Sequence, residues 1–202
     1  MCYDAGVTFI DEVRVTTQPR CAGICREYHT AMAIERCVGC GAEVPTIDGP
    51  IHRYMTSAPA CWQRYGALLD VLYGHPTYQE ALIMCVDTYA VQHPGTPNPQ
   101  AIQSVAIHLL NLYTYLVRGR PITHPQATFS KRAFHAIAPP ALRAAYWLVP
   151  PTFAGTRTVF DMPLTGTCEA ITSAAHAWAE SVWAAWSAHH GRIAAWYTQY
   201  AS

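Results

Sequence analysis

The segment from Cys37 to Cys61 constrains the fold of this chain more than any other. It places Cys37 and Cys40 in a Cys-x-x-Cys pair, and His52 and Cys61 follow within the same twenty-five residues. Thiolates and imidazoles are the ligands that tetrahedral zinc sites use. We therefore predict a zinc-binding knuckle of Cys37, Cys40, His52 and Cys61, with a structural role of the metal favoured over a catalytic one.

The composition of the same segment supports a turn-rich metal site. Its glycines and prolines are dense, and neither a helical nor a strand period is visible. Thiol redox chemistry at Cys37 and Cys40 is the weaker alternative, since it expects a strand before the first cysteine and a helix after it. No strand is evident before Cys37. A second, all-sulfur ligand set remains open: Cys21, Cys25, Cys37 and Cys40.

Length and charge exclude several classes of protein. The chain has 202 residues, of which 13% are charged, and its formal net charge is zero. Nucleic-acid grooves and anionic membrane surfaces attract clusters of basic residues, so neither partner is expected. No apolar run approaches the ~20 residues that span a bilayer, and the first residues do not resemble a signal peptide. We expect a cytoplasmic protein, in which the eight cysteines serve as metal ligands or buried thiols rather than as disulfides.

Apolar periodicity predicts a mainly α fold, a bundle of about four to five helices. Residues 1–36 are expected to form an N-terminal arm, and residues 37–202 a single helical domain with the knuckle at 37–61. Helices are predicted from about Ser57 to Gly74, over 77–92, over 99–118 and over 167–200. Residues 119–165 are interrupted by prolines and contain short helical pieces, so this region is a candidate lid.

Polar side chains on the second and third helices form another constellation. A short proline-rich connection predicts that these helices pack as an antiparallel hairpin. The hairpin brings His93 near Gln103 and Ser104, with His108 one turn deeper, and leaves Asp87 to orient a neighbouring histidine. Two interpretations are open: histidines that are hydrogen-bonded within the core, or a functional pocket.

The last helix carries tryptophans and histidines in a regular pattern. His176, Trp183 and His190 recur every seven residues, and Glu180 lies one turn after His176. This spacing is compatible with a metal site in a helical bundle, but it also fits a hydrophobic core whose histidines are hydrogen-bonded. Aromatic side chains of this helix are also candidates for a homodimer interface.

Several motifs resemble a bacterial domain-of-unknown-function family, the one numbered 5946. They include Cys37-Val-Gly-Cys40-Gly, Asp48-Gly-Pro-Ile-His52-Arg-Tyr54, Pro59-Ala-Cys61-Trp62, Val86-Asp-Thr-Tyr-Ala-Val-Gln-His93-Pro-Gly95 and Gln103-Ser-Val-Ala-Ile-His108-Leu. The resemblance covers about residues 37–196. It implies no activity, but it favours the ligand set with His52 because all four of its residues lie inside these motifs.

Three hypotheses for the function follow. The first is a metal-dependent enzyme that acts on a small molecule in a histidine-lined pocket between helices. A complete shell of three cysteines and one histidine leaves no open position on zinc, so the chemistry is expected elsewhere. The candidate catalytic residues are His93, His108, Asp87 and His190. The alternatives are a zinc-stabilised helical module that binds a ligand without catalysis, and a thiol or redox protein that uses Cys37 and Cys40.

Overall fold

The computed structural model describes residues 33–120, 130–132, 134–136 and 138–201. The chain divides into two units, Met1–Ala31 and Met32–Ser202, and every described residue belongs to the second unit. The predicted N-terminal arm lies outside the described residues except for positions 33–36, as do the alternative ligands Cys21 and Cys25.

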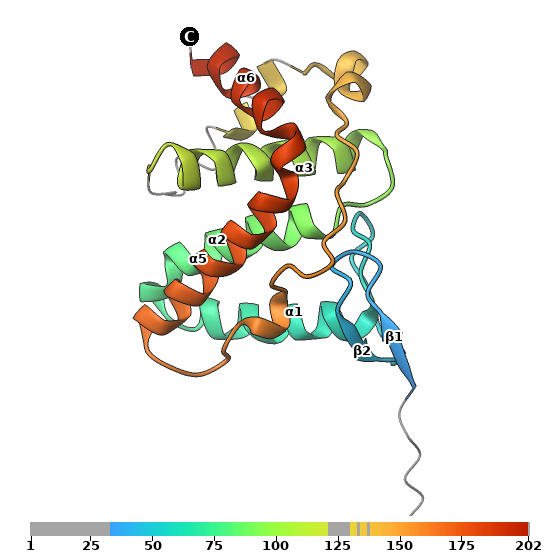
Figure 1. Cartoon of the computed structure of the whole chain (residues 1–202), viewed down its shortest axis with the longest axis vertical. Helices are drawn as coiled ribbons and strands as arrows, with labels where there is room; N and C mark the ends of the chain where they lie inside the picture. Colours follow the sequence, from blue (N-terminus) through green and yellow to red (C-terminus); the bar gives the residue numbers. More distant parts are fainter. Residues whose placement is uncertain (1–32, 121–129, 133, 137, 202) are drawn as a thin grey trace, which may run out of the picture. The chain divides into compact units, whose positions relative to one another are not determined.

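The predicted mainly α fold is confirmed. The described residues contain five α-helices and a two-stranded antiparallel sheet (Figure 1). Their bounds are Ile34–Arg36 (β1), Glu43–Pro45 (β2), Pro59–Tyr73 (α1), Gln79–Gln92 (α2), Pro99–Leu112 (α3), Cys168–Ala185 (α5) and His190–Ala201 (α6). A 3₁₀ turn, Pro76–Tyr78, precedes α2, and a π-helical turn, Tyr113–Val117, follows α3.

Helix α2 is the central element. It packs against α1, α3 and α5, and Figure 1 shows it between α1 and α3 with α5 crossing it. Ten of its fourteen residues are buried. A helix that is covered on most sides has few solvent-facing positions, so polar residues on α2 are buried as well. These include Asp87 and Gln92, which are 2% and 0% exposed.

The ends of α2 and α3 explain why these helices are neighbours. His93 ends α2, and the Asn98 side chain begins α3 by accepting hydrogen bonds from the backbone N–H groups of Gln100 and Ala101. Pro99 occupies the first turn, where its missing N–H costs nothing. The connection is too short for the helices to separate, which agrees with the predicted hairpin.

The C-terminal region differs from the prediction of one helix over 167–200. A 3₁₀ turn, Trp186–His189, separates α5 from α6. Its tighter winding changes the direction in which later side chains point. Trp186 is fully buried against Phe153, with ring centroids 6.2 Å apart, and the His189 Nε2 lies 2.9 Å from the Val149 carbonyl oxygen. Contacts with residues 149–153 thus favour the break.

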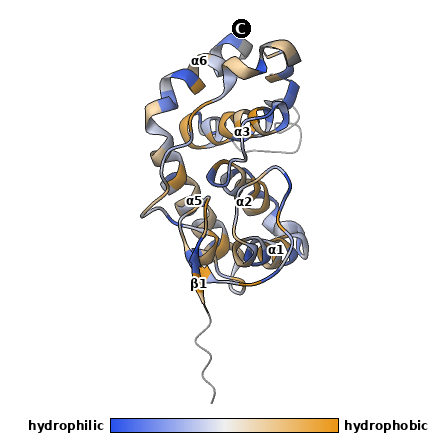
Figure 2. Cartoon of the chain, turned by 90° about the vertical axis from the view of Figure 1, so that its right-hand side faces the viewer, coloured by the Kyte–Doolittle hydropathy of each residue, from blue (hydrophilic) through white to orange (hydrophobic). Residues whose placement is uncertain are grey.

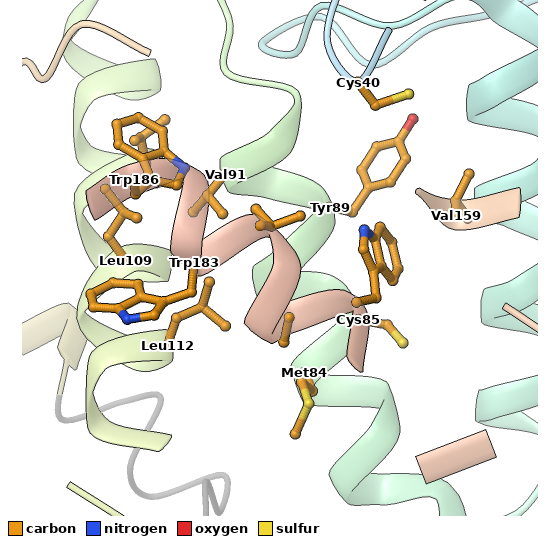
Figure 3. Packing of buried hydrophobic residues seen from close by; sticks show 14 of the residues in the cluster. Cys40, Met84, Cys85, Tyr89, Val91, Leu109, Leu112, Val159, Trp183 and Trp186 are labelled. Carbon is orange, nitrogen blue, oxygen red and sulfur yellow. The ribbon is translucent and has the colours of Figure 1, made fainter. Parts of the chain in front are cut away.

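The aromatic stripe of this region belongs to the core, as one of the two interpretations predicted. Trp178, Val182, Trp186 and Ile193 are all 0% exposed. Figure 3 shows Trp183 and Trp186 packed beside Leu109 and Leu112 of α3. Figure 2 shows both hydrophobic and hydrophilic residues along each of the stacked helices α1, α2 and α3.

The proline-rich region between α3 and α5 is largely irregular where it is described. Residues 130–132 and 134–136 are helical, and the region also contains two 3₁₀ turns, Pro140–Tyr146 and Val159–Asp161. The predicted lid falls partly on residues 121–129, which lie outside the described residues. Among the helices that the structure describes, none has the length and apolar character needed to cross a membrane.

Candidate metal centre and the Asp87–His108 pair

The first part of the knuckle is the turn that joins β1 to β2. The Cys37 N–H donates to the Ala42 carbonyl at 2.8 Å, and the Gly41 N–H donates to the Cys37 carbonyl at 2.9 Å. Gly41 has φ +76, a left-handed conformation that glycine adopts without strain. These bonds place Cys37 and Cys40 on one side of the turn, and both are 2% exposed. A strand does precede Cys37, contrary to expectation, but the turn leads into a second strand rather than a helix.

The third cysteine comes from α1. Cys61 lies in the first turn of this helix and is 0% exposed, and its Sγ is 3.8 Å from that of Cys40. The backbone N–H of Ala58, just before α1, donates to the Cys37 sulfur at 3.4 Å. The start of α1 therefore supplies one sulfur to the group and a hydrogen-bond donor to another.

The fourth member is His93, at the C-terminal end of α2. Its Nδ1 lies 3.0 Å from the Tyr89 carbonyl oxygen and its Nε2 lies 3.4 Å from the Cys61 sulfur. A carbonyl oxygen only accepts, so this partner assigns the proton to Nδ1 and leaves a lone pair on Nε2. This is the tautomer of a metal ligand, and a carbonyl acceptor behind the ring is the usual way to hold it.

The ligand atoms of these four residues form one buried group. The sulfurs of Cys37, Cys40 and Cys61 and a ring nitrogen of His93 all lie within 4.8 Å of one another. Hydrogen bonds from the other two thiols lower the pKa of Cys37. Sharing a proton with Cys37 raises the pKa of Cys40 to about 11 and also raises that of Cys61. The geometry suits one metal ion with three sulfur ligands and one nitrogen ligand.

Close backbone packing holds the end of α2 against this group. The Thr56 N–H donates to the His93 carbonyl at 3.3 Å, and the Thr56 hydroxyl donates to the Pro94 carbonyl at 2.5 Å. A Cβ added to Gly39 would lie 2.4 Å from the His93 ring, and one added to Gly95 would lie 2.2 Å from the Tyr54 carbonyl oxygen. Only glycine fits at these two positions, because the segments approach more closely than a side chain allows.

His52 lies outside the group, although the sequence interpretation places it among the ligands. Its Nδ1 accepts a hydrogen bond from the Tyr54 N–H at 3.3 Å, and its ring centroid is 5.5 Å from that of Trp62. The structure thus brings together three of the four residues predicted as ligands and adds His93, a residue predicted for catalysis. The spacing of the cysteines carries no information about the end of α2.

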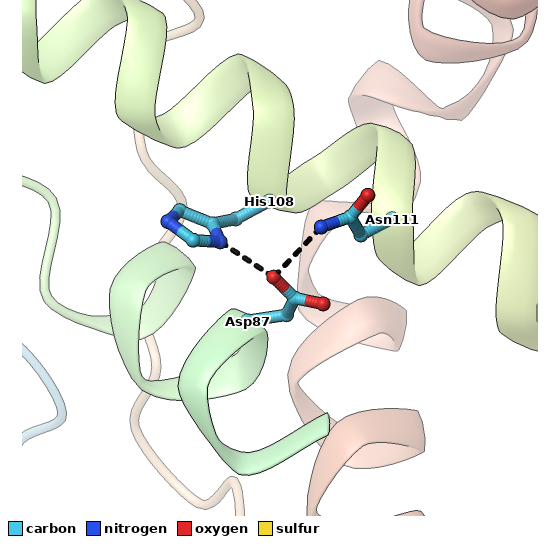
Figure 4. A network of polar contacts seen from close by, with 3 residues as sticks. All are labelled: Asp87, His108 and Asn111. Atoms are coloured by element: carbon cyan, nitrogen blue, oxygen red, sulfur yellow. Dashed lines mark hydrogen bonds and ion pairs between the residues drawn. The ribbon is translucent and has the colours of Figure 1, made fainter. Parts of the chain in front are cut away.

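The second polar group lies farther along the same helix. The His108 Nδ1 is 2.5 Å from the Asp87 Oδ1, and the Asn111 Nδ2 donates to the same oxygen at 3.0 Å (Figure 4). The Asp87 side chain is 3% exposed and that of His108 is 21% exposed. The sequence interpretation assigns Asp87 to orient a histidine, and the structure places its carboxylate against the His108 ring. Asn111 is missed by sequence reasoning, because an amide on a helix has no distinctive spacing.

This pair lies in the wall of a cavity of about 590 Å³ between α2 and α3. Two other polar residues named from the sequence, Gln103 and Ser104, line the same cavity. His93 does not line it, since it is fully buried in the cysteine group. The histidines that were predicted to share a pocket are therefore divided between two places, one fully buried and one open to ligands.

The histidines of the C-terminal region have other partners. His190 is stacked on Trp183 at 4.0 Å, and its Nε2 lies 2.9 Å from the Trp183 carbonyl oxygen. His176 lies 3.2 Å from Glu80 of α2 rather than pairing with Glu180. Within the described ranges, no hydrogen bond or ion pair joins His190 to Asp87 or His108, and no metal-binding group forms around His176.

Comparison with known proteins gives a family but no activity. Residues 35–187 match the model of a family of unknown function, DUF5946. No curated protein matches the chain, and no solved structure matches it. The matched region contains the cysteine group and the Asp87–His108 pair. Since the match covers most of the sequence, the chain belongs to the family DUF5946.

Proposed function

We propose that this chain is a zinc-containing enzyme that acts on a small molecule in the cavity between α2 and α3, with His108 as its general base. One observation carries the proposal: the nearly buried Asp87 carboxylate holds Nδ1 of a half-buried histidine in the cavity wall. A histidine oriented by a carboxylate is the arrangement used for proton transfer in many enzymes. The metal stabilises the scaffold.

The cysteine group supports zinc as the metal. Two sulfurs bound tetrahedrally to zinc at about 2.3 Å stand roughly 3.8 Å apart, and the Cys40 and Cys61 sulfurs are 3.8 Å apart. Donors also face the sulfurs: the Ala58 N–H at Cys37 and the Tyr89 hydroxyl, 3.7 Å from Cys61. These donors offset the negative charge that three thiolates leave on a zinc ion.

The completeness of this ligand set supports a structural role for zinc. Catalytic zinc sites keep one position for water or substrate, whereas structural sites have four protein ligands. All four residues here are buried. Burial also argues against a thiol-exchange protein that uses Cys37 and Cys40, because such thiols must reach a partner. The proposed chemistry is therefore assigned to the cavity.

The geometry of the pair gives His108 a defined chemistry. The Asp87 carboxylate accepts a hydrogen bond from the Nδ1–H of His108, so Nε2 carries the lone pair and can take a proton from a bound molecule. The positive charge that then forms on the ring lies next to the carboxylate, which stabilises it. Asn111 holds the same carboxylate oxygen and limits its rotation.

A screen in deuterated water tests the proposal even though the substrate is unidentified. Mixtures of small molecules are incubated with the protein, and products or deuterium incorporation are followed by mass spectrometry. We expect turnover that falls by about 10²-fold or more in His108→Gln and Asp87→Asn, with metal content unchanged. His189→Gln is the control, because His189 does not line the cavity. Turnover that is unaffected by His108→Gln would refute the assignment.

A zinc-stabilised binding module is the second candidate function. The size of the cavity supports a binding module as much as it supports an enzyme. A volume of about 590 Å³ is in the range that holds small ligands. Saturable binding that shifts the His108 ring resonances, with no product from any bound compound, would identify such a module.

A further inference from the structure

We propose that the ligand of this cavity is a small organic anion with an apolar body, a carboxylate being the simplest case, and that Lys131 recognises its charge. The inference deepens the proposed function, since it names the class of molecule that His108 would act on. It rests on which charged side chains of the cavity lining are exposed to a ligand and which are buried.

Among the described residues that line the cavity, the one acidic side chain is buried and is not accessible to a ligand. Asp87 is 2% exposed, and its Oδ1 is held by both His108 and Asn111. A cationic ligand needs an accessible carboxylate to replace its lost hydration. Asp87 does not present one, so the lining disfavours a cation.

Lys131 is the basic counterpart and is open to a ligand. It lines the cavity and is exposed, and it makes no ion pair with any residue in the part of the chain that the structure describes. The segment 121–129 that precedes it contains no aspartate or glutamate. An ammonium without a protein counter-ion attracts an anionic group of a ligand.

The rest of the lining defines the body of the ligand. Leu82, Ile83, Val86 and Ile107 form an apolar wall, and Gln100 and Gln103 add amide groups that can donate hydrogen bonds. Burial of an apolar body against this wall supplies affinity, while one charged group fixes its orientation. The combination fits an amphipathic acid better than a sugar or a polyamine.

Lys131 is the only lysine of the chain, which makes a direct test possible. The protein is acetylated with a limiting amount of an N-hydroxysuccinimide ester, and modification of Lys131 is measured by mass spectrometry against the N-terminal amine as reference. The probes are two matched pairs, phenylacetate with phenylacetamide and hexanoate with hexanamide. We expect at least one acid to slow acetylation of Lys131 about fivefold or more, and its amide to have no effect.

Binding to variants gives the second arm of the experiment. Lys131→Gln should weaken binding of the protective acid by about twofold to fivefold, as expected for one exposed ion pair, and should leave binding of the amide unchanged. Arg132→Gln is the control, because Arg132 is exposed but does not line the cavity. The acid preference should also shrink at high salt.

The outcomes separate this inference from the proposed function. Equal protection by acid and amide, or by neither, overturns the anion inference and leaves catalysis by His108 standing. Lys131-dependent binding of an acid whose turnover does not depend on His108 supports the inference and contradicts the proposed function.

Discussion

At the scale of single residues, His93 decides the composition of the candidate metal centre. Its Nε2 faces the sulfurs, while the ring of His52 is engaged with Tyr54 and Trp62. We predict that His93→Gln loses most of its bound zinc and that His52→Gln retains one zinc per chain. Metal analysis after dialysis, with equal circular dichroism spectra as a check on folding, measures both. Loss of zinc in His52→Gln with retention in His93→Gln would restore the ligand set favoured by the sequence.

Gly39 tests the close approach of the knuckle to α2. In Gly39→Ala the new methyl group would lie 2.5 Å from the Thr56 carbonyl oxygen and 2.4 Å from the His93 ring, so one of these segments must move. We expect a loss of about 3 kcal/mol in the free energy of unfolding together with weaker zinc retention.

Gly66→Ala is the matched control for this substitution. A Cβ at Gly66, in α1, meets nothing within 4 Å, and alanine in a helix is favoured over glycine by about 0.5–1 kcal/mol. Urea unfolding should therefore move in opposite directions for the two variants. A neutral effect at Gly39 would mean that the knuckle is less tightly packed than its distances indicate.

At the scale of the elements, the buried side chain of Gln92 connects three parts of the fold. Its Nε2 donates to the Thr156 hydroxyl at 2.9 Å and to the Arg157 carbonyl at 2.7 Å, and its Oε1 accepts from the Trp178 indole at 3.0 Å. One amide thus joins α2 to α5 and to the segment that precedes Val159. Buried polar groups that lose their partner cost about 1–3 kcal/mol each.

Replacing this amide should therefore be costly. We predict that Gln92→Ala lowers the free energy of unfolding by about 3 kcal/mol or more, because it leaves the Trp178 N–H and the Arg157 carbonyl without their partner. Gln63→Ala, at an exposed position of α1, should change stability by less than about 0.5 kcal/mol. Denaturant titration of both variants compares them directly, and similar midpoints would show that the Gln92 hydrogen bonds are replaced by water.

The elements also show what could be predicted from the sequence. Apolar periodicity, together with the residues that mark helix ends, located α1, α2 and α3. Pro59 and Pro99 mark helix starts and Gly74 marks a helix end, and each acts through the local backbone conformation within one turn. The break at Trp186–His189 was missed, since it arises from contacts with residues 149–153, far away in sequence. The same limit applies to His93. Its position beside Cys61 depends on how α2 packs on α1, and spacing along the chain does not contain that information.

At the scale of the whole molecule, the candidate metal centre brings together segments that are distant in sequence. Cys37 and Cys40 come from the hairpin between β1 and β2, Cys61 from the start of α1, and His93 from the end of α2. Asp87 lies six residues before His93 on α2, a separation of about 9 Å along a helix. A zinc ion at the proposed site would therefore fix the end of the helix that carries the carboxylate of the Asp87–His108 pair.

Removal of the metal should destabilise the segments around the proposed zinc site before it affects the rest of the bundle. We predict that a strong chelator lowers the melting temperature by about 10 °C, which corresponds to roughly 3–4 kcal/mol for a chain of this size. Amide hydrogen exchange should increase in residues 37–61 and 89–95. The cores of α3 and α5 should change little, because buried apolar contacts hold them together. Restoring zinc should reverse both effects, whereas uniform exchange over all helices would indicate that the metal holds the entire bundle.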